Sequence, residues 1–226
     1  MYGWNQHDAS MGLVSFWRGI CRVNHWFNLC FAASGCWQTD KSSINKHVAM
    51  KIRQTTQADL DDILSVERAA FNRDSEVNLT RALLADPSAE PRLSLMAYVD
   101  DQPVGHILFT KGILTNHPDV ALSFLAPLAV IPKFQRQGIG GALIRRSLEL
   151  LAEAYGDLIV VLGHPAYYPK FGFKPALELG FEPTYPIPAK VADAWMVQAL
   201  KPNIIGRVSG RVICCDAMNK PEIWRE

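Results

Sequence analysis

A short loop rich in glutamine, arginine and glycine separates an apolar strand pattern from a helix pattern. The strand pattern covers residues 120–131, and the helix pattern runs from about Gly138 to Ala154. The loop reads Gln135-Arg136-Gln137-Gly138-Ile139-Gly140-Gly141. The start of a helix offers unpaired backbone N–H groups and the positive end of its dipole, and glycines let the backbone approach an anion closely. This loop therefore predicts a binding site for a pyrophosphate.

Two other phosphate motifs do not fit these residues. A P-loop needs Gly-Lys followed by Ser or Thr, which the chain lacks. A dinucleotide-binding fingerprint needs a third glycine at position 143, where Leu143 stands. Glycines at a strand-to-helix turn can also serve structure alone, so the prediction needs support from a second segment.

The second segment follows an apolar strand pattern at 158–162 and combines polar with aromatic residues. It reads Gly163-His164-Pro165-Ala166-Tyr167-Tyr168-Pro169-Lys170-Phe171-Gly172-Phe173. Together the two segments resemble the GCN5-related N-acetyltransferase (GNAT) family, whose motifs are Gln/Arg-x-x-Gly-x-Gly/Ala and, after the fifth strand, Tyr-x-x-x-Gly-Phe. The run Leu125-Ala-Pro-Leu-Ala-Val130 is similar to the bacterial YhbS-like subgroup. The resemblance covers about residues 50–180.

The resemblance implies an α/β fold with a GNAT-type mixed, mostly antiparallel sheet, flanked by helices and with splayed strands 4 and 5. It also implies acetyl-CoA as the acyl-donor substrate, no metal, and transfer of the acetyl group to a primary amine. Backbone groups of Leu128, Ala129 and Val130 are expected to hold the pantetheine arm between the splayed strands. The residues expected to hold the pyrophosphate are Gln135, Arg136, Gln137, Gly138, Ile139, Gly140 and Gly141.

Tyr168 stands four residues before Gly172, where the family carries its general-acid tyrosine. Acyl transfer from a thioester to an amine needs a neutral amine, a stabilised oxyanion and a proton for the departing thiolate. After direct attack by the amine, the Tyr168 phenol is expected to supply that proton. The alternative role for Tyr168 is to pack its ring beside the cofactor, and Tyr167 is expected in the wall of the site.

The sequence identifies no general base. Some family members place a carboxylate on strand 4, but residues 120–130 contain none. Glu76 begins a predicted helix over the acceptor side and is a candidate substrate-binding residue, although a solvated glutamate near a helix N-terminus fits equally well. His106 is expected in the core or the wall. The missing carboxylate leaves open a non-catalytic acyl-CoA-binding or regulatory module of the same fold.

The elements that position these residues follow from periodicity, caps and turn residues. Thr56 and Asp59 predict the capped start of a helix after a short strand at Met50–Gln54. Pro127 cannot donate to a strand ladder, so it predicts a bulge or an open edge within the strand at 120–131. The other predicted elements are a helix at 75–85 and strands at 93–99, 103–110, 158–162, 175–183 and 194–201.

The chain is expected to comprise three parts. Residues 1–49 form a non-core N-terminal extension, 50–190 the N-acetyltransferase domain, and 191–226 C-terminal strands and a tail. Residues 203–226 resemble an appendage with one strand at 211–215. Polar residues interrupt every apolar window of the extension, which predicts no membrane span. The run Ala33-Ser34-Gly35-Cys36 loosely resembles a lipoprotein cleavage box and leaves a secreted, anchored protein as an alternative.

The composition is typical of a soluble globular protein, with 49% apolar and 20% charged residues among 226. A formal net charge of +1 argues against a broad nucleic-acid-binding surface. Five cysteines, an odd number, indicate reduced thiols rather than a disulfide framework. We therefore expect a cytoplasmic enzyme that acts on a small-molecule or peptide amine acceptor, without nucleic-acid or membrane partners. Whether it forms a homodimer stays open.

Overall fold

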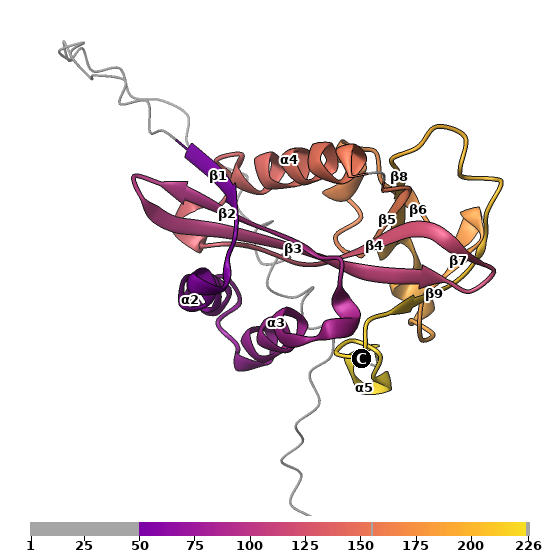
Figure 1. The fold of residues 1–226 in the computed structure, drawn as a ribbon, viewed down its shortest axis with the longest axis horizontal. Helices are drawn as coiled ribbons and strands as arrows, with labels where there is room; N and C mark the ends of the chain where they lie inside the picture. Colours follow the sequence, from indigo (N-terminus) through magenta and orange to yellow (C-terminus); the bar gives the residue numbers. More distant parts are fainter. Residues whose placement is uncertain (1–49, 155, 225–226) are drawn as a thin grey trace, which may run out of the picture.

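The structure, a computed structural model, describes residues 50–154 and 156–224 of the chain. The expected N-terminal extension and its cleavage-box resemblance lie outside these residues. A central sheet separates helix α4 from helices α2 and α3, which cover its opposite face (Figure 1). The helices are α2 (Leu60–Phe71), α3 (Asp74–Ala85), α4 (Ile139–Glu153) and α5 (Pro221–Trp224). The strands are β1 (Met50–Gln54), β2 (Leu93–Val99), β3 (Gln102–Leu114), β4 (His117–Val130), β5 (Leu158–Leu162), β6 (Lys174–Pro175), β7 (Phe181–Glu182), β8 (Trp195–Ala199) and β9 (Gly210–Cys214).

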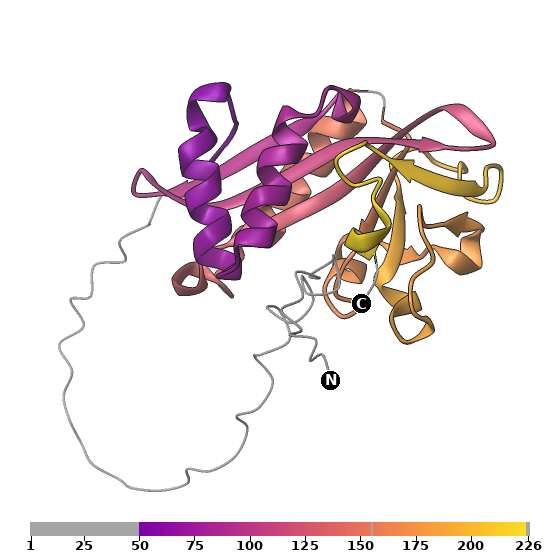
Figure 2. The same ribbon diagram turned by 90° about the horizontal axis from the view of Figure 1, so that it is seen from below.

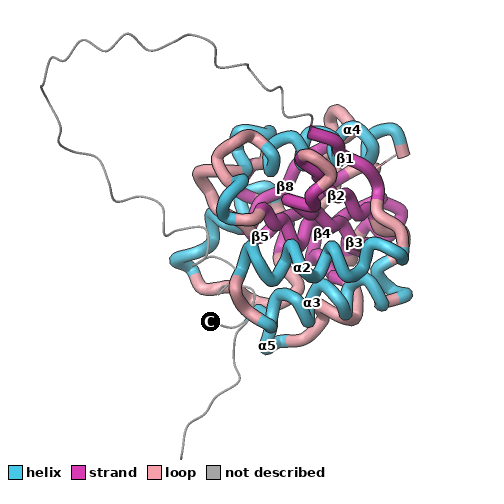
Figure 3. Tube along the Cα trace, turned by 90° about the vertical axis from the view of Figure 1, so that its left-hand side faces the viewer, coloured by secondary structure: helices cyan, strands magenta, loops and turns pink. Residues whose placement is uncertain are grey.

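The sheet has the order β1-β2-β3-β4-β5-β8-β6. Every pairing along this path is antiparallel except that of β4 with β5, which is parallel. This arrangement confirms the predicted mixed, mostly antiparallel sheet. Figure 3 shows the same layers from the side, with the strands between α4 and the α2–α3 pair. No helix in the described part of the chain is long and apolar enough to span a membrane.

Helix α2 begins through the predicted pairing of Thr56 and Asp59. The Asp59 carboxylate accepts the Thr56 backbone N–H at 2.7 Å and also accepts the guanidinium of Arg53, with Nη2 to Oδ1 at 2.6 Å. Hydrogen bonding to Arg53 is the main reason that the pKa of Asp59 lies well below its usual range. A short 3-10 turn over Gln57–Asp59 then leads directly into the helix.

Apolar side chains on both faces of the sheet attach the helices. On one face, Leu143 and Ile144 of α4 pack with Ile107 of β3. On the other, Ile63 and Val66 of α2 form a cluster with three strand residues, namely Met96, Tyr98 and Ala129. Helices α2 and α3 lie side by side across the strands (Figure 2).

The last residues of the described chain belong to the core. Strand β9 pairs antiparallel with β3 and in parallel with β7. Trp224 is fully buried, with its ring centroid 5.9 Å from that of Phe124 and 6.1 Å from that of Trp195. The expected strand at 211–215 is confirmed by β9, but the expectation of an appendage is wrong. Many residues of this C-terminal segment are polar, but its few large apolar side chains complete this core.

Replacing Trp224 tests how much this aromatic cluster contributes. Trp224→Ala should lower the free energy of unfolding by about 3–5 kcal/mol, because it removes a large buried side chain and leaves a cavity. The exposed neighbour Glu222 serves as control, since Glu222→Ala should change stability by no more than about 0.5 kcal/mol. Urea unfolding of the three proteins measures both effects. Equal stabilities would show that the C-terminal residues do not contribute to the core.

Candidate functional site

Strands β4 and β5 separate near the middle of β4. They pair only over Leu122–Leu125 of β4, opposite Leu158–Val161. Strand β3 continues to pair with β4 as far as Val130, with a register shift between the pairs Phe109–Leu125 and Ile107–Leu128. The predicted bulge at Pro127 is thereby confirmed. From Ala126 to Val130, the edge of β4 that faced β5 is paired with no strand of the described chain.

The loop after β4 delivers the chain to the start of α4. Gly138 caps the helix with a φ of 86°, a left-handed conformation that side chains disfavour. The helical ladder begins with the Ala142 N–H, which donates to the Gly138 carbonyl at 2.9 Å. The backbone N–H groups of residues 139–141 therefore precede the ladder, as those of the first helical turn do in general. These donors and the helix dipole create a site suited to an anion.

Two glutamine side chains hold the loop in shape. Gln135 Nε2 donates to the Val130 carbonyl at 2.9 Å, and Gln137 Nε2 donates to the Lys133 carbonyl at 3.0 Å. Both amides are thus bonded to the loop's own backbone. Arg136 between them is exposed and has a φ of 61°, which is strained for a residue with a Cβ atom.

The second sequence segment packs against this loop. A Cβ atom added at Gly140 would lie 2.7 Å from the Tyr167 hydroxyl, and one added at Gly141 would lie 3.2 Å from the Phe171 ring. The Tyr167 and Phe171 rings contact each other edge to face, with centroids 5.4 Å apart. Tyr167 thus forms a wall beside the first turn of α4. The two segments are brought together because α4 offers no side chain at positions 140 and 141.

Tyr168 lies deeper, where the strands begin to separate. It shares a buried cluster with Leu125 and Val161, the last paired residues of β4 and β5. Its ring covers Gly163, since a Cβ atom there would come within 2.1 Å of the ring. Burial raises the pKa of the Tyr168 phenol, so the hydroxyl stays protonated at neutral pH.

Two cations lie beside the aromatic wall. The Lys170 ammonium lies 5.9 Å from the Tyr167 ring centroid, and the Arg145 guanidinium lies 5.8 Å from that of Phe171. Both side chains are exposed at the surface next to the start of α4. Their positive charge fits a polyanionic ligand.

The opposite face of the sheet contains buried acidic groups. Glu76 lies in the first turn of α3 and is only 5% exposed, so it is not the solvated glutamate that the sequence allowed. Its hydrogen-bond partner is the Ser75 hydroxyl. Burial raises the pKa of Glu67 on α2, and the charge of Glu76 adds to this effect while His106 opposes it.

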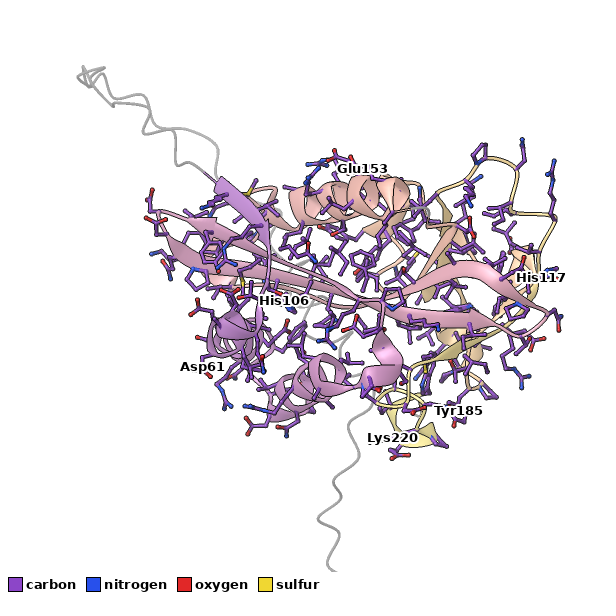
Figure 4. The ribbon with its side chains drawn as sticks, in the orientation of Figure 1. Asp61, His106, His117, Glu153, Tyr185 and Lys220 are labelled. Atoms are coloured by element: carbon purple, nitrogen blue, oxygen red, sulfur yellow. The ribbon has the colours of Figure 1, made fainter. Side chains whose placement is uncertain are left out.

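His106 is fully buried on β3, above α2 (Figure 4). Its Nδ1 lies 2.5 Å from Glu67 Oε1, and its Nε2 lies 3.0 Å from the Ser94 hydroxyl oxygen. No motif or cap in the sequence singles out Glu67 or Ser94. The available signal was a charged residue at a core position, because Glu67 follows Ile63 by four residues within the apolar stripe of α2.

The described residues contain no cluster of three His, Cys, Asp or Glu side chains that could hold a metal ion. Cys214 and Cys215 are buried free thiols. Burial raises the pKa of both, to about 11 for Cys214. Neither thiol is therefore an activated nucleophile.

Sequence comparison finds close relatives of this chain. Residues 91–175 match the family model described as "Acetyltransferase (GNAT) domain". The uncharacterized N-acetyltransferase YjhQ of Escherichia coli K12 is 42% identical over 164 residues, which cover 72% of this chain and 90% of YjhQ. The uncharacterized N-acetyltransferase YhbS of the same strain is 30% identical over 164 residues, which cover 72% of this chain and 95% of YhbS.

Two solved structures share the fold and exceed 25% identity. The crystal structure of Escherichia coli YhbS in complex with CoA has a TM-score of 0.71 and 28% identity, covering 78% of this chain and 96% of YhbS. The crystal structure of a Brucella melitensis GNAT acetyltransferase in complex with acetyl-CoA has a TM-score of 0.60 and 30% identity. It covers 76% of this chain and 99% of the Brucella chain. Given these relatives, a sheet that separates between β4 and β5, and a helix start suited to an anion at α4, the chain belongs to the GNAT family of N-acetyltransferases.

Proposed function

We propose that this protein transfers the acetyl group of acetyl-CoA to a primary amine, with the acyl donor lying along the open edge of β4. The observation that carries the proposal is the continuity of that edge with the start of α4. In CoA the pantetheine arm and the pyrophosphate are joined end to end, so they need two such sites side by side. The relatives crystallised with CoA and acetyl-CoA support the same class of donor.

The proposed donor contacts follow from the free backbone groups. The backbone groups of residues 128–130 that are bonded neither to β3 nor to Gln135 are offered to the amides of the pantetheine arm. Residues 139–141 offer N–H groups to the pyrophosphate. Gln135 and Gln137 act by keeping the loop in shape, because their amides are bonded to loop carbonyls. Arg136, Lys170 and Arg145 contribute positive charge around the phosphates.

The proposed chemistry is direct attack. The amine nitrogen forms a bond to the thioester carbon, the C–S bond breaks, and the sulfur leaves as a thiolate that must be protonated. Tyr168 is the proposed donor of that proton, because its buried phenol is held in the protonated form at the point where the strands separate. Its ring packs directly over the backbone of Gly163 and makes an edge-to-face contact with Phe173, with the two ring centroids 5.5 Å apart.

A non-catalytic acyl-CoA-binding module is the second candidate. It is favoured by one observation, the absence of any titratable side chain on β4 between Val120 and Val130. An amine panel separates the two candidates. Acetyl-CoA would be incubated with putrescine, benzylamine, lysine and a peptide with a free N-terminus, and products would be detected by mass spectrometry. An acetylated amine formed at a rate above the enzyme-free rate supports the enzyme. Tight acetyl-CoA binding without any product supports the binding module.

Removing only the Tyr168 hydroxyl tests its role. Tyr168→Phe should lower kcat by about 10² to 10⁴-fold, the usual contribution of general acid–base catalysis. The affinity for acetyl-CoA should stay within a few fold, because the ring still covers Gly163. Tyr185→Phe is the matched control, since the Tyr185 hydroxyl bonds Asn219 far along the C-terminal segment. A Tyr168→Phe protein with wild-type kcat at saturating substrates would remove Tyr168 from the mechanism.

A methyl group at Gly140 tests the pyrophosphate site. Gly140→Ala should weaken acetyl-CoA binding by at least about tenfold, which is about 1.4 kcal/mol. The new Cβ atom would also meet the Tyr167 hydroxyl at 2.7 Å, whereas its next neighbours lie at 3.6 Å and beyond. The double variant Gly140→Ala/Tyr167→Phe removes that clash. It leaves only the steric obstruction that the new methyl group places between the pyrophosphate and the backbone N–H groups of the loop.

Calorimetric titration of the single and double Gly140 variants, and of Tyr167→Phe alone, separates the two effects. We expect the double variant to bind acetyl-CoA at least about tenfold more weakly than Tyr167→Phe. Dephospho-CoA, which keeps the pyrophosphate and lacks the 3′-phosphate, should lose affinity to a similar degree. Full recovery of affinity in the double variant would mean that Gly140 serves only to accommodate Tyr167.

We also propose that residues 50–226 are sufficient for function. A protein shortened to these residues should melt within a few degrees of the full chain and bind acetyl-CoA equally well. A second protein, shortened to 50–190, should fail to fold, because it lacks β8, β9 and Trp224. Thermal melting and titration compare the three proteins. Loss of acetyl-CoA binding in the 50–226 protein would show that the first 49 residues belong to the site.

A further inference from the structure

A row of hydrogen-bonded side chains crosses the sheet on the face covered by α2 and α3. Thr55 Oγ1 donates to the Ser94 hydroxyl oxygen at 2.7 Å, and that oxygen lies 3.0 Å from His106 Nε2. His106 Nδ1 lies 2.5 Å from Glu67 Oε1. Thr55 follows β1, and Ser94 and His106 belong to β2 and β3. The row therefore runs from the β1 edge of the sheet toward β4, where Ala129 is paired with His106.

The two ends of the row differ in their access to water. At one end, Thr55 and Ser94 line a cavity of about 560 Å³ between the sheet, α2 and α3. Thr55 is partly exposed, so water in this cavity can reach its hydroxyl. At the other end, Glu67 is fully buried, and its Oε2 has no hydrogen-bond partner in the described chain. Val66, its neighbour on α2, packs against Ala129 of β4.

An unpartnered buried carboxylate oxygen is costly, so its presence calls for an explanation. A purely structural Glu67–His106 pair would not need the two further hydroxyls or a cavity at their end. Hydroxyl and imidazole groups both accept and donate hydrogen bonds, so a proton can pass along such a row. The row ends at Glu67, beside the part of β4 that is proposed to hold the pantetheine arm.

We propose that Glu67 accepts the proton released by the attacking amine and that His106, Ser94 and Thr55 relay it to water in the cavity. This inference rests on the proposed function. The N–C bond forms, the C–S bond breaks, and the thiolate takes its proton from Tyr168. The amine proton binds Glu67 Oε2, and rotation of the carboxyl group brings this O–H to His106 Nδ1, which takes the proton. The Thr55 hydroxyl, which donates to Ser94 in the resting state, turns toward the water of the cavity, and the Ser94 hydroxyl turns toward Thr55. A proton then passes from Nε2 to Ser94, from Ser94 to Thr55, and from Thr55 to water. Tyr168 is reprotonated from solvent.

The charges around Glu67 suit this role. His106 on β3 and Glu76 on α3 are the titratable groups that act on it, Tyr98 on β2 lies in the neighbouring cluster, and β4 contributes none between residues 120 and 130. Burial raises the pKa of Glu67 above the ordinary value of about 4.3 and makes it a stronger proton acceptor. Because the ionised form is required, kcat should fall as pH drops through this raised pKa.

The test compares kcat against pH for variants along the row, using the amine of the panel with the highest kcat/KM. Glu67→Gln keeps the size of the side chain but not its proton affinity, so kcat should fall at least about 100-fold and the acidic limb of the profile should disappear. Ser94→Ala and Thr55→Val interrupt the relay and should each lower kcat about tenfold, with the limb retained. Acetyl-CoA affinity should stay within a few fold for all three.

Thr110→Val is the matched control, because Thr110 is a buried hydroxyl residue on β3 outside the row. It should leave kcat within about twofold of the wild type. If the wild type is active and Glu67→Gln keeps both its kcat and the acidic limb of the pH profile, the relay is overturned while the proposed function stands. Should Glu67→Gln fail to fold, wild-type kcat in both Ser94→Ala and Thr55→Val would overturn it equally. A wild type that acetylates no amine would reject the proposed function and the relay together.

Discussion

Strands β4 and β5 separate after Leu125, and the elements around the site are arranged about the open edge that this leaves. A strand in the middle of a sheet normally pairs on both edges, because buried backbone groups left without partners are costly. Here β4 keeps its ladder with β3 and gives up the other edge over residues 126–130. Pro127 sits where pairing ends, and its missing N–H would have broken a ladder there in any case. The open edge is then available to a ligand that carries amide groups of its own.

The segment that borders this opening is held by contacts between glycines and aromatic rings. Tyr167 covers Gly140, Phe171 lies against Gly141, and Tyr168 covers Gly163. A Cβ atom would overlap the Tyr168 ring at Gly163, meet the Tyr167 hydroxyl at Gly140 and press against the Phe171 ring at Gly141. The anion site on α4 and the proposed proton donor are consequently positioned by the same short stretch of chain. Changes at the glycines should therefore affect both binding and chemistry.

Much of this organisation could be predicted from sequence, because it depends on local patterns. The loop at 135–141, the bulge at Pro127 and the capped start of α2 each rest on residue types with strong backbone preferences. The Glu67–His106–Ser94 row could not be predicted, since its members come from α2, β3 and β2 and meet only through strand register. The place of Trp224 was equally hidden, because a single large residue near the end of the chain gives no periodic signal.

Hydrogen exchange with and without acetyl-CoA can show whether the donor binds along the open edge of β4. Mass spectrometry would follow the peptides that contain residues 126–131 and 137–142, with the protein saturated by acetyl-CoA. If the donor lies along the open edge of β4 and against the start of α4, these amides should exchange more slowly in the complex than in the free protein. Saturated binding that leaves both peptides unprotected would contradict this account of the site.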